Sequence, residues 1–202
     1  MNRSSALLVS VLCAAFCHAQ VPTVPGAELK LVAEGYKFTE GPAVDPQGNV
    51  WFTDQPNDRI LKWSVDTGKV TDFMKPAGRS NGLYFDREGK LIACADEKGE
   101  LWRIDPETKK VTVLLDNYDH KLFNGPNDVW VDPAGGLYFT DPFYKRDYWQ
   151  GREKPDQEKQ RVYYLPKGAK KPVIASDGIS NPSSRALSMS LSVERASVQM
   201  AM

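Results

Sequence analysis

The chain has 202 residues, enough for one all-β domain or slightly more than one small domain. Its 26 basic and 26 acidic residues give a formal net charge of zero, which argues against nucleic acid or an anionic membrane as the main partner. Hydrophobic residues make up 41% of the sequence and aromatic residues 10%, a content that supports a packed core and excludes a disordered chain.

The first 19 residues have the pattern of a signal peptide. Arg3 provides a positive charge, residues 6–16 form an apolar run, and the tripeptide at 17–19 provides a small-x-small cleavage site. The apolar run is shorter than the helix of about 20 residues that spans a bilayer. A membrane anchor or a buried N-terminal helix is the alternative. We expect a periplasmic or secreted protein with no membrane association after cleavage.

Cleavage would leave one cysteine, Cys94, and one histidine, His120. Cys94 then has no partner for an intramolecular disulfide, and its place in an apolar run indicates a buried, unreactive thiol. A single histidine cannot build a multi-histidine zinc site, and the sequence has no Gly-x-Ser-x-Gly nucleophile elbow. Chemistry in this chain must therefore depend on carboxylates and amides, with a bound metal ion as a further candidate.

Three internal repeats give the strongest structural signal. An apolar run, a turn and a second apolar run recur around Asp45, Asp86 and Asp132, which are 41 and 46 residues apart. Each copy continues with two further strand-like segments, and a charged segment at about 145–160 is inserted in the third. Four short strands in a unit of about 40–50 residues predict a β-propeller blade. A plain β-sandwich does not explain the repeating register.

We therefore expect a partial β-propeller over residues 27–182. The expected blades lie at about 40–76, 81–117 and 127–176. Residues 28–32 are expected to form an early strand that pairs with the last blade of a closed ring. Residues 183–202 contain no glycine, aspartate or aromatic residue, and we expect a divergent tail that arises from a frameshift, altered splicing or truncation. A genuine variable tail is the alternative.

The repeats align three polar residues. Glu40, Asn81 and Asn127 each precede the turn aspartate of their repeat by five residues. The innermost strand of every propeller blade begins near the central channel, so these side chains are expected to point at one axis. Carboxylate and amide oxygens suit a hard cation such as calcium or magnesium. The alternative is that the two asparagines stabilise loop turns, as asparagine commonly does.

Four motifs at blade spacing carry a family resemblance. They are Glu40-Gly-Pro, Ser80-Asn-Gly-Leu, Gly125-Pro-Asn-Asp-Val and Phe139-Thr-Asp-Pro-Phe-Tyr. Over about 29–182 the sequence resembles the senescence marker protein, gluconolactonase and luciferin-regenerating enzyme family, which includes regucalcin-like proteins. The resemblance implies a six-bladed propeller with one catalytic divalent metal ion on its axis. Calcium is the expected metal, with zinc or magnesium as alternatives.

The resemblance also implies roles for single residues. Glu40 and Asn127 match two of the four metal ligands, Asn81 matches a position that faces the substrate, and Arg79 and Tyr144 are candidates for the substrate pocket. The metal would polarise the carbonyl group of a small-molecule lactone, and an aspartate from a later blade would act as general base on water. That aspartate has no match in this sequence, so the catalytic base is unknown.

The sequence departs from the family pattern where a fourth blade should open. The expected Pro-Asn-Gly-like step reads Asn181-Pro-Ser-Ser, which places serine where the family has a metal-binding asparagine. Six blades of about 45 residues need about 270 residues, so we expect about three blades and a fragment. The expected function is a gluconolactonase-like, metal-dependent lactone hydrolase, impaired or inactive in this chain. Open strand edges would favour aggregation.

The same predicted propeller fold is compatible with two alternative functions. One is a non-catalytic periplasmic propeller module that binds carbohydrate or protein through the aromatic stretch 143–149. The other is a metal-dependent phosphotriesterase. The sequence indicates neither the oligomeric state nor the identity of the lactone.

Overall fold

We describe the protein from a computed structural model. The structure describes residues 26, 28 and 30–183, so the expected signal peptide and residues 184–202 of the expected tail lie outside the described part. The chain divides into two units, residues 1–31 and residues 32–202, and the fold below is that of the second unit. Among the described residues, no helix has the length and apolar character needed to cross a membrane.

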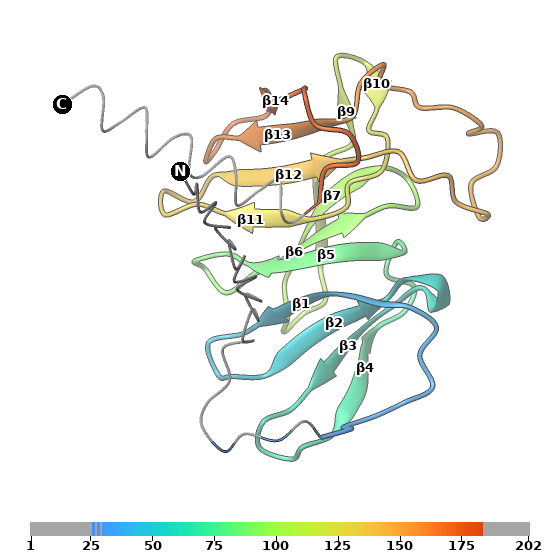
Figure 1. The fold of residues 1–202 in the computed structure, drawn as a ribbon. Helices are drawn as coiled ribbons and strands as arrows, with labels where there is room; N and C mark the ends of the chain where they lie inside the picture. The colour runs from blue at the N-terminus through green and yellow to red at the C-terminus, as the bar shows by residue number, and fades with distance from the viewer. Residues whose placement is uncertain (1–25, 27, 29, 184–202) are drawn as a thin grey trace, which may run out of the picture. The chain divides into compact units, whose positions relative to one another are not determined.

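The second unit contains three four-stranded antiparallel sheets, in each of which the strands follow chain order (Figure 1). Blade 1 consists of β1 (Thr39–Val44), β2 (Val50–Asp54), β3 (Arg59–Trp63) and β4 (Val70–Met74). Blade 2 consists of β5 (Ser80–Phe85), β6 (Leu91–Ala95), β7 (Glu100–Ile104) and β8 (Val111–Leu115). Blade 3 consists of β11 (Val129–Val131), β12 (Leu137–Asp141), β13 (Arg161–Leu165) and β14 (Val173–Ser176). The expected all-β fold built from propeller blades is confirmed.

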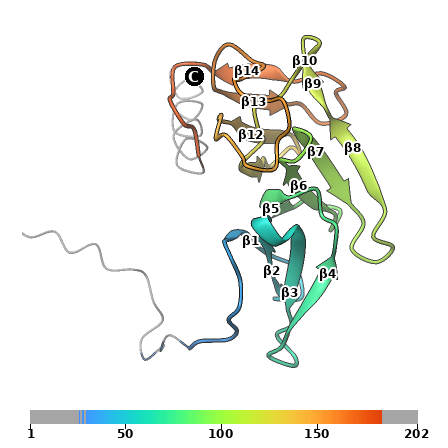
Figure 2. The ribbon, with the colours of Figure 1, turned by 90° about the vertical axis from the view of Figure 1, so that its right-hand side faces the viewer.

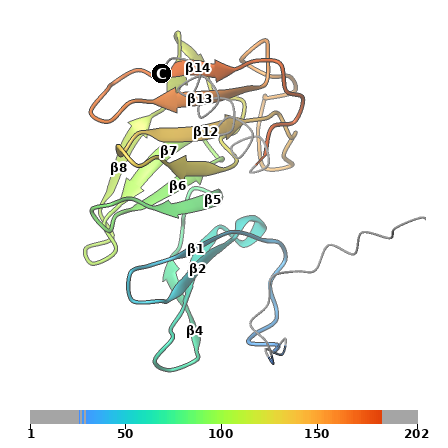
Figure 3. The ribbon, with the colours of Figure 1, turned by 60° about the vertical axis from the view of Figure 1, so that its left-hand side comes forward.

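The first strand of each blade is its inner strand. Strand β1 packs beside β5, and β5 packs beside β11, so blade 2 lies between blades 1 and 3 (Figure 3). The fourth strands β4 and β8 lie on the side of their blades away from β1 and β5 (Figure 2). The inner strands are therefore the elements that bring the three blades together.

Three short elements and one long connection complete the described fold. A 3-10 helix, η1 (Gln55–Asn57), follows β2, and β9 (Asn117–Tyr118) pairs with β10 (Lys121–Leu122) between blades 2 and 3. Residues 142–160, here called the inserted segment, connect β12 to β13 without a strand of their own. The sequence predicted the inserted segment, whereas it did not predict η1 or the β9–β10 ribbon.

No strand forms at the described positions of the stretch 28–32, where the sequence indicated an early strand that pairs with the last blade of a closed ring. They have no strand assignment, and Leu31 and Val32 are 80% and 56% exposed. A strand needs a hydrogen-bonded neighbour to be stable. No strand of the described residues pairs with this stretch, so its alternating sequence has no partner on which to form a ladder.

The turn aspartates close the first hairpin of each blade. In blade 1, Asp45 Oδ1 accepts a hydrogen bond from the backbone N–H of Asn49 at 2.9 Å, and Asp45 Oδ2 accepts one from Trp51 Nε1 at 2.9 Å. In blade 3, Asp132 accepts one from the backbone N–H of Gly136 and another from the hydroxyl of Tyr164, both at 2.8 Å. Aspartate recurs here because its carboxylate satisfies the backbone donors of a tight turn.

Blade 2 is buried on both faces. Every residue of β6 is at most 1% exposed, because one face of the strand packs towards blade 1 and the other towards blade 3. Two of these residues are alanines, and one is Cys94, a free and fully buried cysteine. Burial raises the pKa of the Cys94 thiol well above its usual value, as expected for an unreactive cysteine. The expectation for Cys94 is confirmed.

Candidate functional site

The three polar residues aligned by the repeats lie at equivalent ends of the inner strands. Glu40 and Asn81 are the second residues of β1 and β5, and Asn127 lies two residues before β11. Thr53 Oγ1 is 3.1 Å from the carbonyl oxygen of Glu40 and 3.0 Å from that of Asn81. The N–H of Gly82 donates to the carbonyl oxygen of Asn127 at 2.7 Å. Hydrogen bonds thus join the backbones of neighbouring strand openings.

Glycine at the next position allows this close approach. A Cβ atom at Gly41 would lie 2.4 Å from the carbonyl oxygen of Asn81, and a Cβ atom at Gly82 would lie 2.6 Å from that of Asn127. Real Cβ atoms do not come so close to backbone oxygens, so no other residue fits without a shift of the strands. The Glu-Gly and Asn-Gly pairs of the sequence are therefore packing requirements as well as motifs.

The side chains at these openings have no hydrogen-bond partner among the described residues, although Asn81 is only 3% exposed. The amide atoms of Asn81 are not among the fully enclosed polar atoms that lack a partner, so they remain within reach of solvent or a ligand. One carboxylate and two amides supply oxygen ligands of the kind that calcium and magnesium prefer. No group of three or more His, Cys, Asp or Glu within the described ranges is placed to hold a metal, so an ion at this site would need the asparagine oxygens.

The model of one protein family matches this architecture and its sequence. The SMP-30/Gluconolactonase/LRE-like region matches residues 38–190, which include all three blades and the three strand openings. The chain belongs to this family.

Individual relatives agree with the family match. A gluconolactonase of Zymomonas mobilis is 30% identical over 174 residues, which cover 79% of this chain and 48% of the relative. The solved structure of a Xanthomonas campestris gluconolactonase superposes with a TM-score of 0.68 at 26% identity, over 72% of this chain and 49% of that chain. The chain spans about half the length of these gluconolactonases.

A third comparison extends the fold to a calcium-binding protein. The structure of regucalcin from Agrobacterium tumefaciens matches with a TM-score of 0.52 over 71% of this chain and 44% of that chain. At 18% identity this similarity shows the shared fold alone.

Arg79 and Tyr144, the two candidates for the substrate pocket, differ from each other in how far the protein already engages them. Arg79 lies next to the opening of β5, where Nη1 donates to the carbonyl oxygen of Pro56 at 3.0 Å and the guanidinium group lies 4.3 Å from the ring centre of Tyr148. Tyr144 is 38% exposed, with the guanidinium group of Arg146 at 5.6 Å from its ring centre. Their roles as pocket residues stay predictions, and Arg79 is already engaged by the protein.

Two aspartates missed by the sequence analysis hold the strand openings in this family member. Asp54, at the end of β2, accepts hydrogen bonds from the N–H groups of Lys37 and Phe38, just before β1. Asp141, at the end of β12, accepts them from Asn124 at 3.0 Å and Gly125 at 2.8 Å, just before β11. The repeat alignment contained the signal, because both aspartates end the second apolar run of their repeats.

The protonation of Asp141 should make the stability of this family member depend on pH. Burial raises the pKa of Asp141 from 3.8 to about 7, and the N–H donors of Gly125 and Asn124 oppose this rise only in part. The folded chain therefore retains a proton between about pH 4 and pH 7 that the unfolded chain has lost. The protonated form of Asp141 therefore contributes fully to the stability of the fold below about pH 4, and this contribution disappears as the pH rises through 7.

We expect Asp141→Asn to remove this pH-dependent contribution. The variant should lose about 1–3 kcal/mol from an impaired backbone acceptor, and its deficit relative to the wild type should be larger at pH 5 than at pH 8. Urea unfolding at both pH values measures this difference, with Asp66→Asn at an exposed turn as the control for loss of one charge. A deficit that is equal at both pH values would contradict the assignment.

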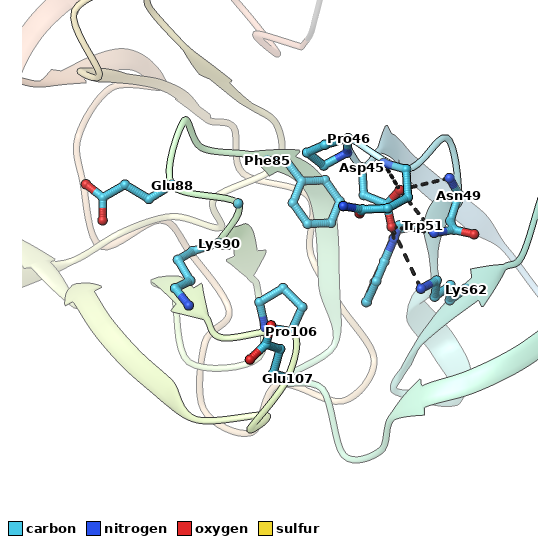
Figure 4. A pocket seen from close by; sticks show the side chains of 12 residues that line it. Asp45, Pro46, Asn49, Trp51, Lys62, Phe85, Glu88, Lys90, Pro106 and Glu107 are labelled. Carbon is cyan, nitrogen blue, oxygen red and sulfur yellow. Dashed lines mark hydrogen bonds and ion pairs between the residues drawn. The ribbon is translucent and has the colours of Figure 1, made fainter.

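A cavity of about 460 Å³ lies at the opposite ends of the inner strands of blades 1 and 2. It is lined by turn residues, and Figure 4 shows Asp45 there between Asn49, Trp51 and Lys62. Lys62 Nζ lies 3.8 Å from Asp45 Oδ2 in its lining. None of the predicted site residues lines this cavity, so we do not assign it to the site.

Proposed function

We propose that the chain forms part of the catalytic ring of a metal-dependent lactone hydrolase of the gluconolactonase type. In this proposal Glu40 and Asn127 hold a divalent cation, with calcium preferred, and Asn81 faces the lactone. The observation that carries the proposal is the convergence of three inner-strand openings whose polar side chains have no partner within the described residues. Similarity to two gluconolactonases over about half their length supports the substrate class.

The chemistry of the site follows from its groups. A bound cation would supply Lewis-acid polarisation of the lactone carbonyl. The amide N–H₂ of Asn81 is suited to donate a hydrogen bond to a substrate oxygen, because no described residue occupies it. Thr53 and the two closely packed glycines keep the strand openings in a fixed relation, which reduces the ordering that substrate binding must impose.

The aromatic stretch 143–149 provides weaker support for a carbohydrate-binding module. Trp149 is 8% exposed, and the hydroxyl of Tyr148 donates to a buried carboxylate, so neither ring is free to stack on a sugar. Tyr144 alone among its aromatic residues is exposed. A stacking surface requires accessible rings, and the stretch serves internal packing instead.

Hydrolysis of glucono-δ-lactone by the purified protein tests the proposal. We expect weak turnover, because this chain matches two of the four metal ligands and its catalytic base is unknown. That turnover should be abolished by a chelator and restored by calcium, together with no hydrolysis of a phosphotriester. Turnover that persists unchanged after metal removal would contradict the metal-dependent mechanism. Hydrolysis of the phosphotriester in preference to the lactone would favour the phosphotriesterase alternative.

A further inference from the structure

The aspartate that directly follows the second strand of blade 2, Asp96, departs from the pattern of its equivalents. Asp54 and Asp141 each accept two backbone N–H groups in front of the inner strand of their own blade. In blade 2 one corresponding N–H group, that of Arg79, donates instead to Asp58 Oδ1 at 2.7 Å, and the N–H of the nearby Ala77 donates to the same atom at 2.9 Å. The carboxylate of Asp96 is thereby released from the capping role that its equivalents perform.

The released carboxylate of Asp96 binds side chains from elsewhere in the fold. Its Oδ2 atom accepts hydrogen bonds from Arg146 Nε at 2.8 Å, the hydroxyl of Tyr148 at 2.8 Å and Gln55 Nε2 at 3.0 Å. Its backbone oxygen accepts one from Trp149 Nε1 at 3.2 Å. Three of these four donors belong to the inserted segment, so a residue of blade 2 binds a connection that belongs to blade 3.

The same contacts place the inserted segment beside the strand openings. Asp96 follows Ala95, which pairs with Ser80 next to Asn81. A Cβ atom on Gly125, two residues before Asn127, would lie 2.6 Å from Asp96 Oδ1 and 3.2 Å from the ring of Trp149. Asp96 and the side chains that bind it therefore lie between the openings of blades 2 and 3.

Asp96 is buried and is held by an ion pair and by contacts around the inserted segment. Asp96 is 1% exposed, and its Oδ1 atom has no hydrogen-bond partner among the described residues. A buried carboxylate that leaves one oxygen unbonded is costly, and the ion pair with Arg146 compensates for part of that cost. Two stacked cation–ring contacts, Arg79 over Tyr148 at 4.3 Å and Arg152 over Trp149 at 4.2 Å, reinforce the same segment.

We infer that Asp96 is a positioning residue that fixes the inserted segment beside Asn81 and Asn127, and through it limits the size of the lactone that the site accepts. The second part of this inference rests on the proposed function. The first part concerns the fold alone and can be tested without activity.

Site-specific proteolysis tests the positioning role. An arginine-specific protease must take the Arg146 side chain into its own pocket, which the hydrogen bond to Asp96 prevents. We expect Asp96→Asn to accelerate cleavage after Arg146 at least about tenfold, since it removes a charged hydrogen bond. Cleavage after Arg161, in β13, should not change. Tyr148→Phe, which removes a single hydroxyl donor, should cause a smaller increase at Arg146.

Glu158→Gln is the matched control, because it removes one negative charge from an exposed position of the same segment that is far from the scissile bond. It should leave cleavage after Arg146 at the wild-type rate. An unchanged rate in Asp96→Asn, or an equal increase at Arg146 and Arg161, would overturn the positioning role, because equal increases indicate general unfolding. Circular dichroism establishes that each variant is folded.

A selectivity measurement tests the consequence for the substrate. We expect Asp96→Asn to increase kcat/KM for a lactone with a long alkyl chain relative to glucono-δ-lactone by about tenfold, mainly through KM. An unchanged ratio despite faster cleavage after Arg146 would overturn the size-limiting role and leave the positioning role intact. If the wild type hydrolyses neither lactone, the proposed function fails, whereas the proteolysis result still decides whether Asp96 positions the segment.

Discussion

Glu40→Gln is expected to lower the affinity of the protein for calcium by about 100-fold or more. The substitution keeps the size and one oxygen of the side chain but removes the carboxylate from the set of three aligned polar residues, Glu40, Asn81 and Asn127. Calcium sites depend strongly on the number of charged oxygen ligands. Loss of a group that merely orients a ligand already costs about 10–100-fold, and a direct ligand contributes more.

Isothermal titration with calcium measures this loss, and Glu34→Gln provides the matched control. Glu34 is an exposed glutamate a few residues before β1 and lies outside the aligned openings. The control should bind calcium as the wild type does. Equal affinities for wild type, Glu34→Gln and Glu40→Gln would remove Glu40 from the set of ligands. Asn127→Asp is a further variant, because an added carboxylate at a ligand position should strengthen binding.

Gly82→Ala is expected to lower the free energy of unfolding by about 3 kcal/mol or more. The new methyl group would lie 2.6 Å from the carbonyl oxygen of Asn127 and 2.7 Å from the Cα atom of Asp128. Both neighbours are backbone atoms, and the N–H of Gly82 already holds Asn127 at 2.7 Å. The clash can be relieved only by separating β5 from β11, which also separates Asn81 from Asn127.

Urea unfolding measures the effect, with Gly178→Ala as the control. Neither glycine has a positive φ, but a Cβ atom at Gly178 would meet no atom within 4 Å. The control should therefore be neutral or slightly stabilising, since alanine restricts the unfolded chain. Similar destabilisation by both substitutions would show that close approach of the inner strands is not the cause.

Repeat spacing and turn chemistry were enough to predict the blades, because each strand pair is local in sequence. Asp45, Asp86 and Asp132 directly follow the first strand of their blades, and backbone hydrogen bonds within five residues close each turn. The same alignment brought Glu40 and Asn81 to equivalent strand openings. Their shared orientation toward an ion stays a prediction, since no contact between their side chains is described.

Long-range contacts explain what the sequence did not predict. Asp96 and Asp141 occupy the same position of the repeat, yet Asp141 caps its own blade whereas Asp96 binds the inserted segment 50 residues away. The difference depends on Asp58, which takes the N–H groups in front of β5. Local sequence does not encode such a choice between partners.

The fully buried Cys94 allows the interior of blade 2 to be probed by thiol labelling. A thiol reagent reaches this side chain only when the sheets on either side of β6 separate, so the alkylation rate of residue 94 reports how often the blade opens. Mass spectrometry of the peptide that contains residue 94 assigns the reaction to this position. If a calcium ion joins the strands that carry Asn81 and Asn127, adding calcium should slow the labelling of Cys94. The labelling rate then reports whether calcium is bound and requires no lactone.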